Sequence, residues 1–100
     1  MDKQIRDKWV KALRSGRYKQ AREYLYDGRG YCCLGVLARV QGAKPNELED
    51  QSLLEYDLKK YSAGIRIKSQ KTLAEKNDGT GFDCKSQTFK EIADYIEKRY

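Results

Sequence analysis

The sequence predicts a small, mainly α-helical domain (α+β) of about four helices, with a short β-hairpin near residues 24–32. Apolar side chains recur at helical spacing in residues 2–15 and 87–99, near the two ends of the chain. A nearly continuous apolar run at residues 33–40 has the length of a short buried helix, and Pro45 follows it. Two short tyrosine-containing segments flank a glycine-containing turn, a pattern typical of a hairpin.

The two terminal helices carry the clearest pattern. In residues 2–15, Trp9 and Leu13 share one helical face, so we expect Trp9 to be a core residue, and a Ser-Gly pair ends the helix. The last helix is expected over residues 87–99, with Ser86 as its N-cap. Its apolar stripe consists of Phe89, Ile92, Ala93 and Ile96.

The region after the first helix is read as the hairpin. Residues 24–26 would pair with residues 31–32 across the turn at 27–30. The alternative is a short helix through residues 19–25. The second strand would run directly into the apolar helix, where Gly35 is expected to permit close approach of another element.

The centre of the chain is more polar. Pro45-Asn46 is expected to open a polar connection. Helical spacing resumes near Glu47 or Gln51 and continues to Tyr61, and residues 62–64 stop that helix.

A further short helix is expected before the last one. Residues 65–67 alternate like a brief strand, with an extended linker as the alternative. Residues 69–76 predict a helix with Leu73 and Ala74 facing inward, followed by a dense cluster of turn residues at 77–81.

Length and composition predict one domain, residues 1–100, in the cytoplasm. The hydrophobic fraction of 39% is low and the charged fraction of 36% is high, so association of identical chains would help to cover apolar surface, and we expect a homo-oligomer. No apolar run approaches the roughly 20 residues of a membrane helix, and residues 1–7 lack the apolar core of a signal peptide. The cysteines Cys32, Cys33 and Cys84 are an odd set with two adjacent, which predicts reduced thiols.

The positive charge is concentrated in the first half of the chain. Residues 1–44 carry eleven Lys/Arg and four Asp/Glu, whereas residues 45–100 carry ten and eleven. The net charges are therefore +7 and −1, in agreement with +6 for the whole chain. Such an asymmetry favours an anion-binding face. The alternative is a solvated surface whose lysines serve solubility.

The residue types argue against catalysis and against a resident metal or cofactor. Histidine is absent, which removes the commonest general base and metal ligand, and the three cysteines have no CxxC spacing. We therefore predict a non-enzymatic protein without a cofactor; a phosphodiesterase using Asn77 and Asp78 ranks last among the hypotheses. The basic turn at 27–30 matches no known phosphate loop, but it could present the N-terminus of the following helix to a phosphate.

Tyrosine is the unusual residue, with eight copies, and four of them lie among basic residues in the first 31 positions. Aromatic and basic side chains together suit bases and phosphates, by stacking and by charge-assisted hydrogen bonds. The alternative for each tyrosine is a half-buried packing role. Gln20 could read a base or satisfy a buried backbone group, and Asn77-Asp78 could simply cap a helix and turn. The candidate ligand-binding residues are Arg14, Tyr18, Lys19, Gln20, Arg22, Tyr31, Asn77 and Asp78.

Several segments together resemble a known family. They are Trp9 with residues 12–16, Tyr18-Lys19-Gln20, the string Tyr31-Cys32-Cys33-Leu34-Gly35-Val36-Leu37, and Leu73-Ala74, Asn77-Asp78-Gly79 and Phe89 with residues 92–96. In these the chain is similar to a family of small, largely uncharacterised proteins of tailed bacteriophages and prophages. Residues 43–70 are unmatched, and residues 21–24 depart from the glycine-rich stretch of that family.

The resemblance implies a phage accessory protein in the cytoplasm of the bacterial host, and such proteins frequently counter host immunity. The first functional hypothesis is an anti-defence protein that sequesters a small anionic nucleotide signal. The alternatives are an inhibitor that binds a host defence protein or nuclease complex directly, and a small nucleic-acid-binding protein. No membrane partner is expected.

Overall fold

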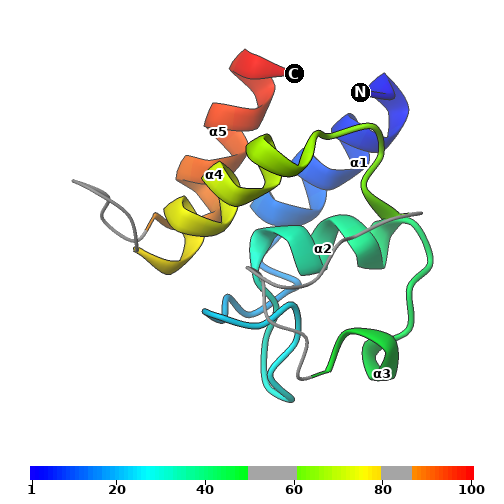
Figure 1. The fold of residues 1–100 in the computed structure, drawn as a ribbon, viewed down its shortest axis with the longest axis vertical. Helices are drawn as coiled ribbons and strands as arrows, with labels where there is room; N and C mark the ends of the chain where they lie inside the picture. The colour runs from blue at the N-terminus through cyan, green and yellow to red at the C-terminus, as the bar shows by residue number, and fades with distance from the viewer. Residues whose placement is uncertain (50–60, 80–86) are drawn as a thin grey trace.

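The described part of the fold consists of helices joined by loops (Figure 1). The structure is a computed structural model, and it describes residues 1–49, 61–79 and 87–100. In these ranges the helices are α1 (Lys3–Arg14), α2 (Cys33–Val40), α3 (Pro45–Leu48), α4 (Ile67–Asp78) and α5 (Phe89–Arg99). The prediction of a mainly helical fold is confirmed.

Four of the helices enclose the core. α1 packs chiefly against α5, and both termini of the chain lie at the same end of this pair (Figure 1). α2 packs against α1 and α4, and α4 packs against α5, which closes a ring of four helix pairs. None of the helices in the described ranges is both long and apolar enough to cross a membrane.

Helix α1 begins and ends as its sequence predicts. The Asp2 carboxylate accepts hydrogen bonds from the backbone N–H groups of Gln4 and Ile5, at 2.8 and 3.1 Å, and so caps the helix. Gly16 follows the last turn with a φ of +75°, a left-handed conformation that glycine adopts without steric cost. The apolar face is confirmed, because Trp9, Val10 and Leu13 are all buried.

Helix α2 begins at a buried N-terminus whose donors are used within the protein. The Cys32 sulfur accepts from the N–H of Gly35 at 3.2 Å, and the Asn77 Oδ1 accepts from the N–H of Cys33 at 3.2 Å. These bonds satisfy donors that a helix start leaves unpaired. The expectation that this N-terminus could present its N–H groups to a phosphate is therefore wrong.

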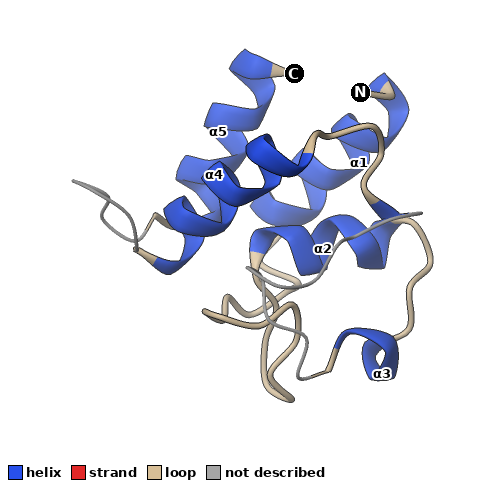
Figure 2. Ribbon diagram, in the orientation of Figure 1, coloured by secondary structure: helices blue, strands red, loops and turns tan. Residues whose placement is uncertain are grey.

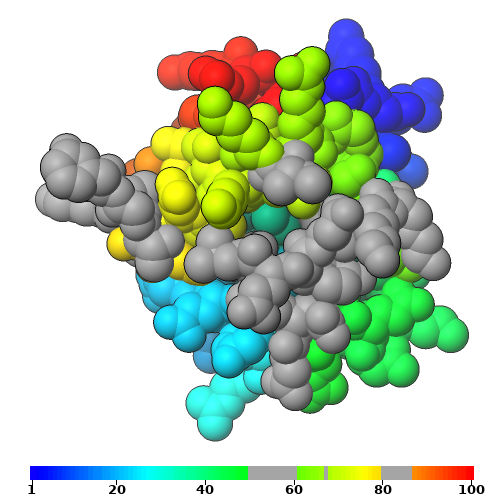
Figure 3. Space-filling model, in the orientation of Figure 1, coloured from blue at the N-terminus to red at the C-terminus, as the bar shows by residue number. Residues whose placement is uncertain are grey.

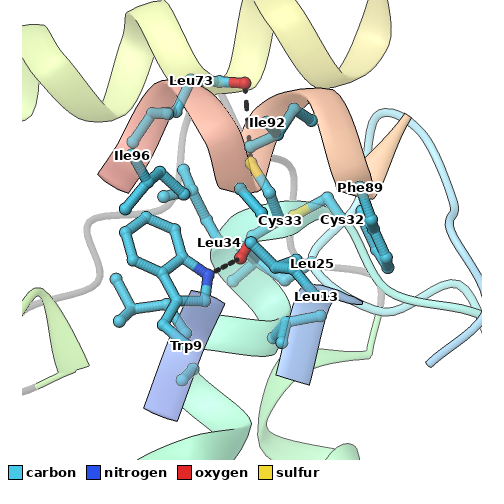
Figure 4. Close-up of a cluster of buried hydrophobic side chains, with 14 of the residues drawn as sticks. Trp9, Leu13, Leu25, Cys32, Cys33, Leu34, Leu73, Phe89, Ile92 and Ile96 are labelled. Atoms are coloured by element: carbon cyan, nitrogen blue, oxygen red, sulfur yellow. Dashed lines mark hydrogen bonds between the residues drawn. The ribbon is translucent and has the colours of Figure 1, made fainter. Parts of the chain in front are cut away.

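The core is built around the segment from Cys32 to Ala38, and every residue in it is buried (Figure 4). Trp9 donates from Nε1 to the carbonyl oxygen of Cys33 at 2.8 Å, which satisfies its one polar group inside the core. The Cys33 thiol contacts the carbonyl oxygen of Leu73 at 3.6 Å and so joins α2 to α4. The predicted core roles of Trp9, Leu73 and Ala74 are confirmed.

The two buried thiols should be inert in the folded protein. Burial raises the pKa of Cys32 to about 12 and raises that of Cys33 well above its ordinary value. Because the thiolate is the reactive form, we expect iodoacetamide at pH 8 to leave the peptide containing both residues unmodified, and to alkylate it fully in urea. Peptide mass spectrometry measures this; rapid alkylation of either residue in the native protein would contradict the assignment. The same burial makes the free energy of unfolding depend on pH. The pKa of the Cys32 thiol is about 12 in the folded protein and near 8.5 in the unfolded chain, so stability is highest below about pH 8.5 and falls as pH rises toward 12. Cys84 lies outside the described residues.

The predicted hairpin near residues 24–32 is not present; within the described ranges only isolated bridges occur, and Figure 2 shows no strand there. Tyr31 pairs with Tyr26 in one antiparallel bridge. However, its N–H donates to the Lys19 carbonyl at 2.7 Å, and its carbonyl accepts from the Ala21 N–H at 2.8 Å. The second segment thus lies parallel to residues 19–21, which leaves no run of antiparallel pairs. The alternative helix over residues 19–25 is also wrong.

Two further boundaries differ from expectation. Pro45 opens the four-residue helix α3 rather than a polar connection, because proline at the first helical position lacks only an N–H that would be unpaired there. The proposed strand at 65–67 is absent, since α4 already begins at Ile67 and the Ile65 carbonyl accepts from the Gln70 side chain at 2.9 Å. The remainder of the helix expected up to Tyr61 falls on residues 50–60, outside the described residues.

Helix α5 follows its predicted pattern, whereas α4 is longer than the expected 69–76. α4 includes Asn77 and Asp78, which were expected in the turn cluster, and Gly79 ends it in a left-handed conformation. α5 begins at Phe89, with Thr88 as its N-cap in a reciprocal pair with Glu91; the proposed cap, Ser86, lies outside the described residues. All four residues of the predicted apolar stripe are buried. Figure 3 shows the side chains of α4 at the surface of one face, above the loop that follows α1.

Candidate functional site

A cavity with three cationic side chains lies beside the C-terminal half of α1. Its volume is about 390 Å³. α1 contributes residues spaced by three, four and seven positions, which places them on one face of the helix. The loop after α1 and the end of α2 complete the wall. We call this the cationic cavity; its described lining residues are Lys8, Lys11, Ala12, Ser15, Arg17, Tyr18 and Val40.

A tight turn after α1 brings Arg17 and Tyr18 to the cavity. The Ser15 hydroxyl donates to the carbonyl oxygen of Ala12 at 2.7 Å and accepts from the N–H of Arg17 at 3.1 Å. Gly16 supplies the left-handed conformation between them. The backbone after α1 therefore folds back against the last turn of the helix and does not extend away from it.

Three tyrosine rings contact one another in a row that begins at the cavity wall. The Tyr18 ring meets the Tyr31 ring edge to face, with centroids 5.5 Å apart, and Tyr26 stacks on Tyr31 at 4.6 Å. Burial raises the pKa of the Tyr31 hydroxyl, and the nearby Arg39 opposes that rise. Tyr31 is held by the Tyr26 ring and by the nearby Arg39. Its own ring therefore gives Tyr18 a fixed edge-to-face partner at the cavity wall.

The charge of the cavity is strongly one-sided. Lys8, Lys11 and Arg17 line it, and no described lining residue is a carboxylate. The C-terminal ends of α1 and α2 lie at the cavity, and each end contributes about −0.5 elementary charge. Two such ends offset about one of the three positive charges. A net charge of about +2 remains, which an anion would neutralise.

The predicted residue Arg14 lies outside the cationic cavity. Its guanidinium forms ion pairs with Asp94 at 2.7 Å and with Glu97 at 2.9 Å. The hydrogen bonds that Arg14 donates to Glu97 and to Asp94 raise the pKa of Arg14, the bond to Glu97 contributing most. The side chain thus links α1 to α5 on an exposed face next to Lys11 and Val10, in an adjoining depression.

Gln20, Asn77 and Asp78 do come together, as a network that holds the fold. The Gln20 Nε2 donates to the Asn77 Oδ1 at 3.0 Å and to the Gln87 carbonyl at 2.7 Å. The Asn77 Nδ2 donates to the Ala21 carbonyl at 2.8 Å and to the Asp78 carboxylate at 3.0 Å. Of the two roles considered for Gln20, the structure shows the second, satisfaction of a backbone group.

The remaining candidates fall around these features. Tyr18 lines the cationic cavity and Tyr31 supports it, whereas Lys19 and Arg22 are exposed on the following loop. The sequence-based candidates did not include Lys8, Lys11, Ala12, Ser15, Arg17 and Val40. The signal for the α1 members was present, because basic residues at positions 8 and 11 recur at helical spacing beside the apolar stripe.

The comparisons with known proteins give one match. The family model for a domain of unknown function, DUF8296, matches residues 1–63, which contain every described lining residue of the cationic cavity but not Asn77. No curated protein and no solved structure is significantly similar to the chain. Within the described ranges, no cluster of three Cys, Asp or Glu side chains could hold a metal ion. Because the family model matches well over half of the chain, the chain belongs to the DUF8296 family.

Proposed function

We propose that this protein binds and sequesters a small anionic ligand of the nucleotide type in the cationic cavity. The observation that carries the proposal is the composition of that cavity: three cations, an aromatic ring, and no carboxylate among its described lining residues. Phosphate groups satisfy the cations, and a nucleobase packs on the ring. Sequestration needs binding and no chemistry, which agrees with a chain that lacks histidine.

The biological setting of the proposal comes from the phage resemblance of the sequence. A phage protein that captures a nucleotide signal in the bacterial cytoplasm would lower its free concentration and so blunt host immunity. Such a protein works stoichiometrically, so its affinity and abundance decide its effect. The homo-oligomer expected from the composition stays a prediction.

The first test is isothermal titration with a panel of cyclic and ADP-ribose-type nucleotides and nucleoside phosphates. A charge-assisted hydrogen bond contributes about 1.5–3 kcal/mol when well shielded and less at an exposed site. We therefore expect Lys11→Ala or Arg17→Ala to weaken binding about five- to tenfold each, and the double variant at least about thirtyfold. Binding should also weaken as salt concentration rises.

The matched control is Lys71→Ala, which removes the same charge from an exposed position of α4 outside the cationic cavity. Alanine is the best helix former, so neither helix should be disturbed. Equal loss of affinity in Lys71→Ala and Lys11→Ala would show that net charge alone acts, and would reject the cavity as the site. Heat from none of the nucleotides would reject the function itself.

A further inference from the structure

We propose that the cationic cavity selects its ligand by the number of phosphate charges and by the presence of one flat ring, and not by the identity of the base. Its ligand class is then the single nucleoside polyphosphate. This inference rests on the proposed function, because it concerns the same site. Three steps lead to it: the polar groups that the cavity lacks, the ring that it offers, and its size.

The cavity offers few groups that could read the edge of a base. Discrimination between bases uses amide side chains for adenine, carboxylates for cytosine, and arginine or lysine for guanine. The described lining residues include neither an amide nor a carboxylate side chain. The serine hydroxyl in the wall is committed, since its hydrogen is donated to the Ala12 carbonyl and its oxygen accepts from the Arg17 N–H. What remains for polar recognition is the Tyr18 hydroxyl and three positive charges, and in a polyphosphate ligand the phosphate groups engage those charges.

The aromatic part of the site is preorganised but indifferent to the base. The Tyr18 ring is held by the edge-to-face contact with Tyr31, which is itself stacked on Tyr26. Every base has a flat face, so stacking on a tyrosine is tolerant of base identity. The Tyr18 hydroxyl can both donate and accept, so it can adapt to either kind of group on a base edge.

The volume suits a ligand with a single nucleoside. Cavities for small ligands span about 300–1,000 Å³, and this one, at about 390 Å³, is near the lower end. Lys8 and Lys11 are three residues apart on α1, and Arg17 lies in the turn that follows the helix. Three cations along one cavity suit the successive phosphates of one chain.

The experiment compares affinities for a matched set of commercially pure ligands. Isothermal titration is carried out with ADP, GDP, CDP and UDP, with AMP and ATP, and with adenosine and pyrophosphate. We expect the four diphosphates to agree within about threefold. Affinity should rise at least about fivefold from AMP to ADP and again to ATP, and adenosine should give no measurable binding. Pyrophosphate should bind at least about fivefold more weakly than ADP, because it lacks the ring.

Two variants separate the ring from the hydroxyl. Tyr18→Leu should weaken ADP about tenfold and leave pyrophosphate within twofold, whereas Tyr18→Phe, which keeps the ring, should change the affinities for the four diphosphates equally. A preference above tenfold for one base overturns this inference while the proposed function stands. If that preference is then lost in Tyr18→Phe, the hydroxyl is the group that reads the base. Equal affinity for pyrophosphate and ADP overturns the role of the ring. Absence of binding by every nucleotide overturns the proposed function together with this inference.

Discussion

The Gly35→Ala variant is expected to lose at least about 3 kcal/mol of unfolding free energy, a large share of the roughly 5–15 kcal/mol typical of a domain. A methyl group at Gly35 would overlap the carbonyl oxygen of Leu25 and lie 3.0 Å from its carbonyl carbon. Both are backbone atoms, so the clash cannot be relieved by rotating a side chain. The hydrogen bond from the Cys32 N–H to the Leu25 carbonyl, at 3.3 Å, would be strained at the same time. Chemical denaturation followed by the fluorescence of Trp9 measures the change.

The sign of the Gly35 result discriminates between two physical effects. Helix propensity alone predicts that alanine in the first turn of α2 stabilises by up to about 1 kcal/mol, whereas packing predicts strong destabilisation. Gly42→Ala is the matched control, because open space surrounds that position and only its φ of +99° is unfavourable to alanine. We expect a cost of about 1–2 kcal/mol there. A stabilised or neutral Gly35→Ala variant would disprove the close approach of the Leu25 backbone to α2.

The Asn77→Ala variant is expected to cost about 3–6 kcal/mol, because it leaves several buried groups without a partner. Asn77 is fully buried. Its side chain accepts from the Cys33 N–H and donates to the Ala21 carbonyl, and both of these residues are buried. Each unsatisfied buried group costs about 1–3 kcal/mol, and the contact with Gln20 is lost in addition. Thermal unfolding should show a fall in Tm of more than about 12 °C.

The adjacent residue provides the control for Asn77. Asp78 is only half-buried, and its carboxylate accepts from the Glu23 N–H at 3.0 Å. Asp78→Ala should therefore cost about 1 kcal/mol. If the two alanine variants lose the same free energy of unfolding, then the buried hydrogen bonds of Asn77 do not contribute more to stability than the exposed one of Asp78, and the network has a different role.

Elements with strong local patterns could be predicted from the sequence. The apolar run at residues 33–40 lies at the observed position of α2, and the stripe from Phe89 to Ile96 is the buried face of α5. In these segments local periodicity and tertiary burial select the same conformation. The segment around Tyr31 behaves differently. Its alternation is compatible with pairing to either of two stretches. In the structure, hydrogen bonds from Gln20 to Asn77 and Gln87, both distant in sequence, hold the stretch at residues 19–21 beside it.

The candidate site was only partly accessible from the sequence for the same reason. A basic, tyrosine-containing first half was visible, and so was Tyr18 as a member. Whether a given cation remains available depends on distant partners: Arg14 meets Asp94 and Glu97, some 80 positions along the chain. The approach of Val40 to α1, which closes the cavity, is likewise a tertiary contact that no local pattern encodes.

The pairing of α1 with α5 also constrains how the protein is made. A ribosome adds about 5–20 residues per second, so roughly 4–17 s separate the synthesis of Leu13 from that of Ile96. Throughout this interval the apolar face of α1 has no α5 against which to pack. Until α5 has been synthesised, the part of this face that α5 covers is therefore exposed to solvent or to a chaperone, even where α2 already packs against α1.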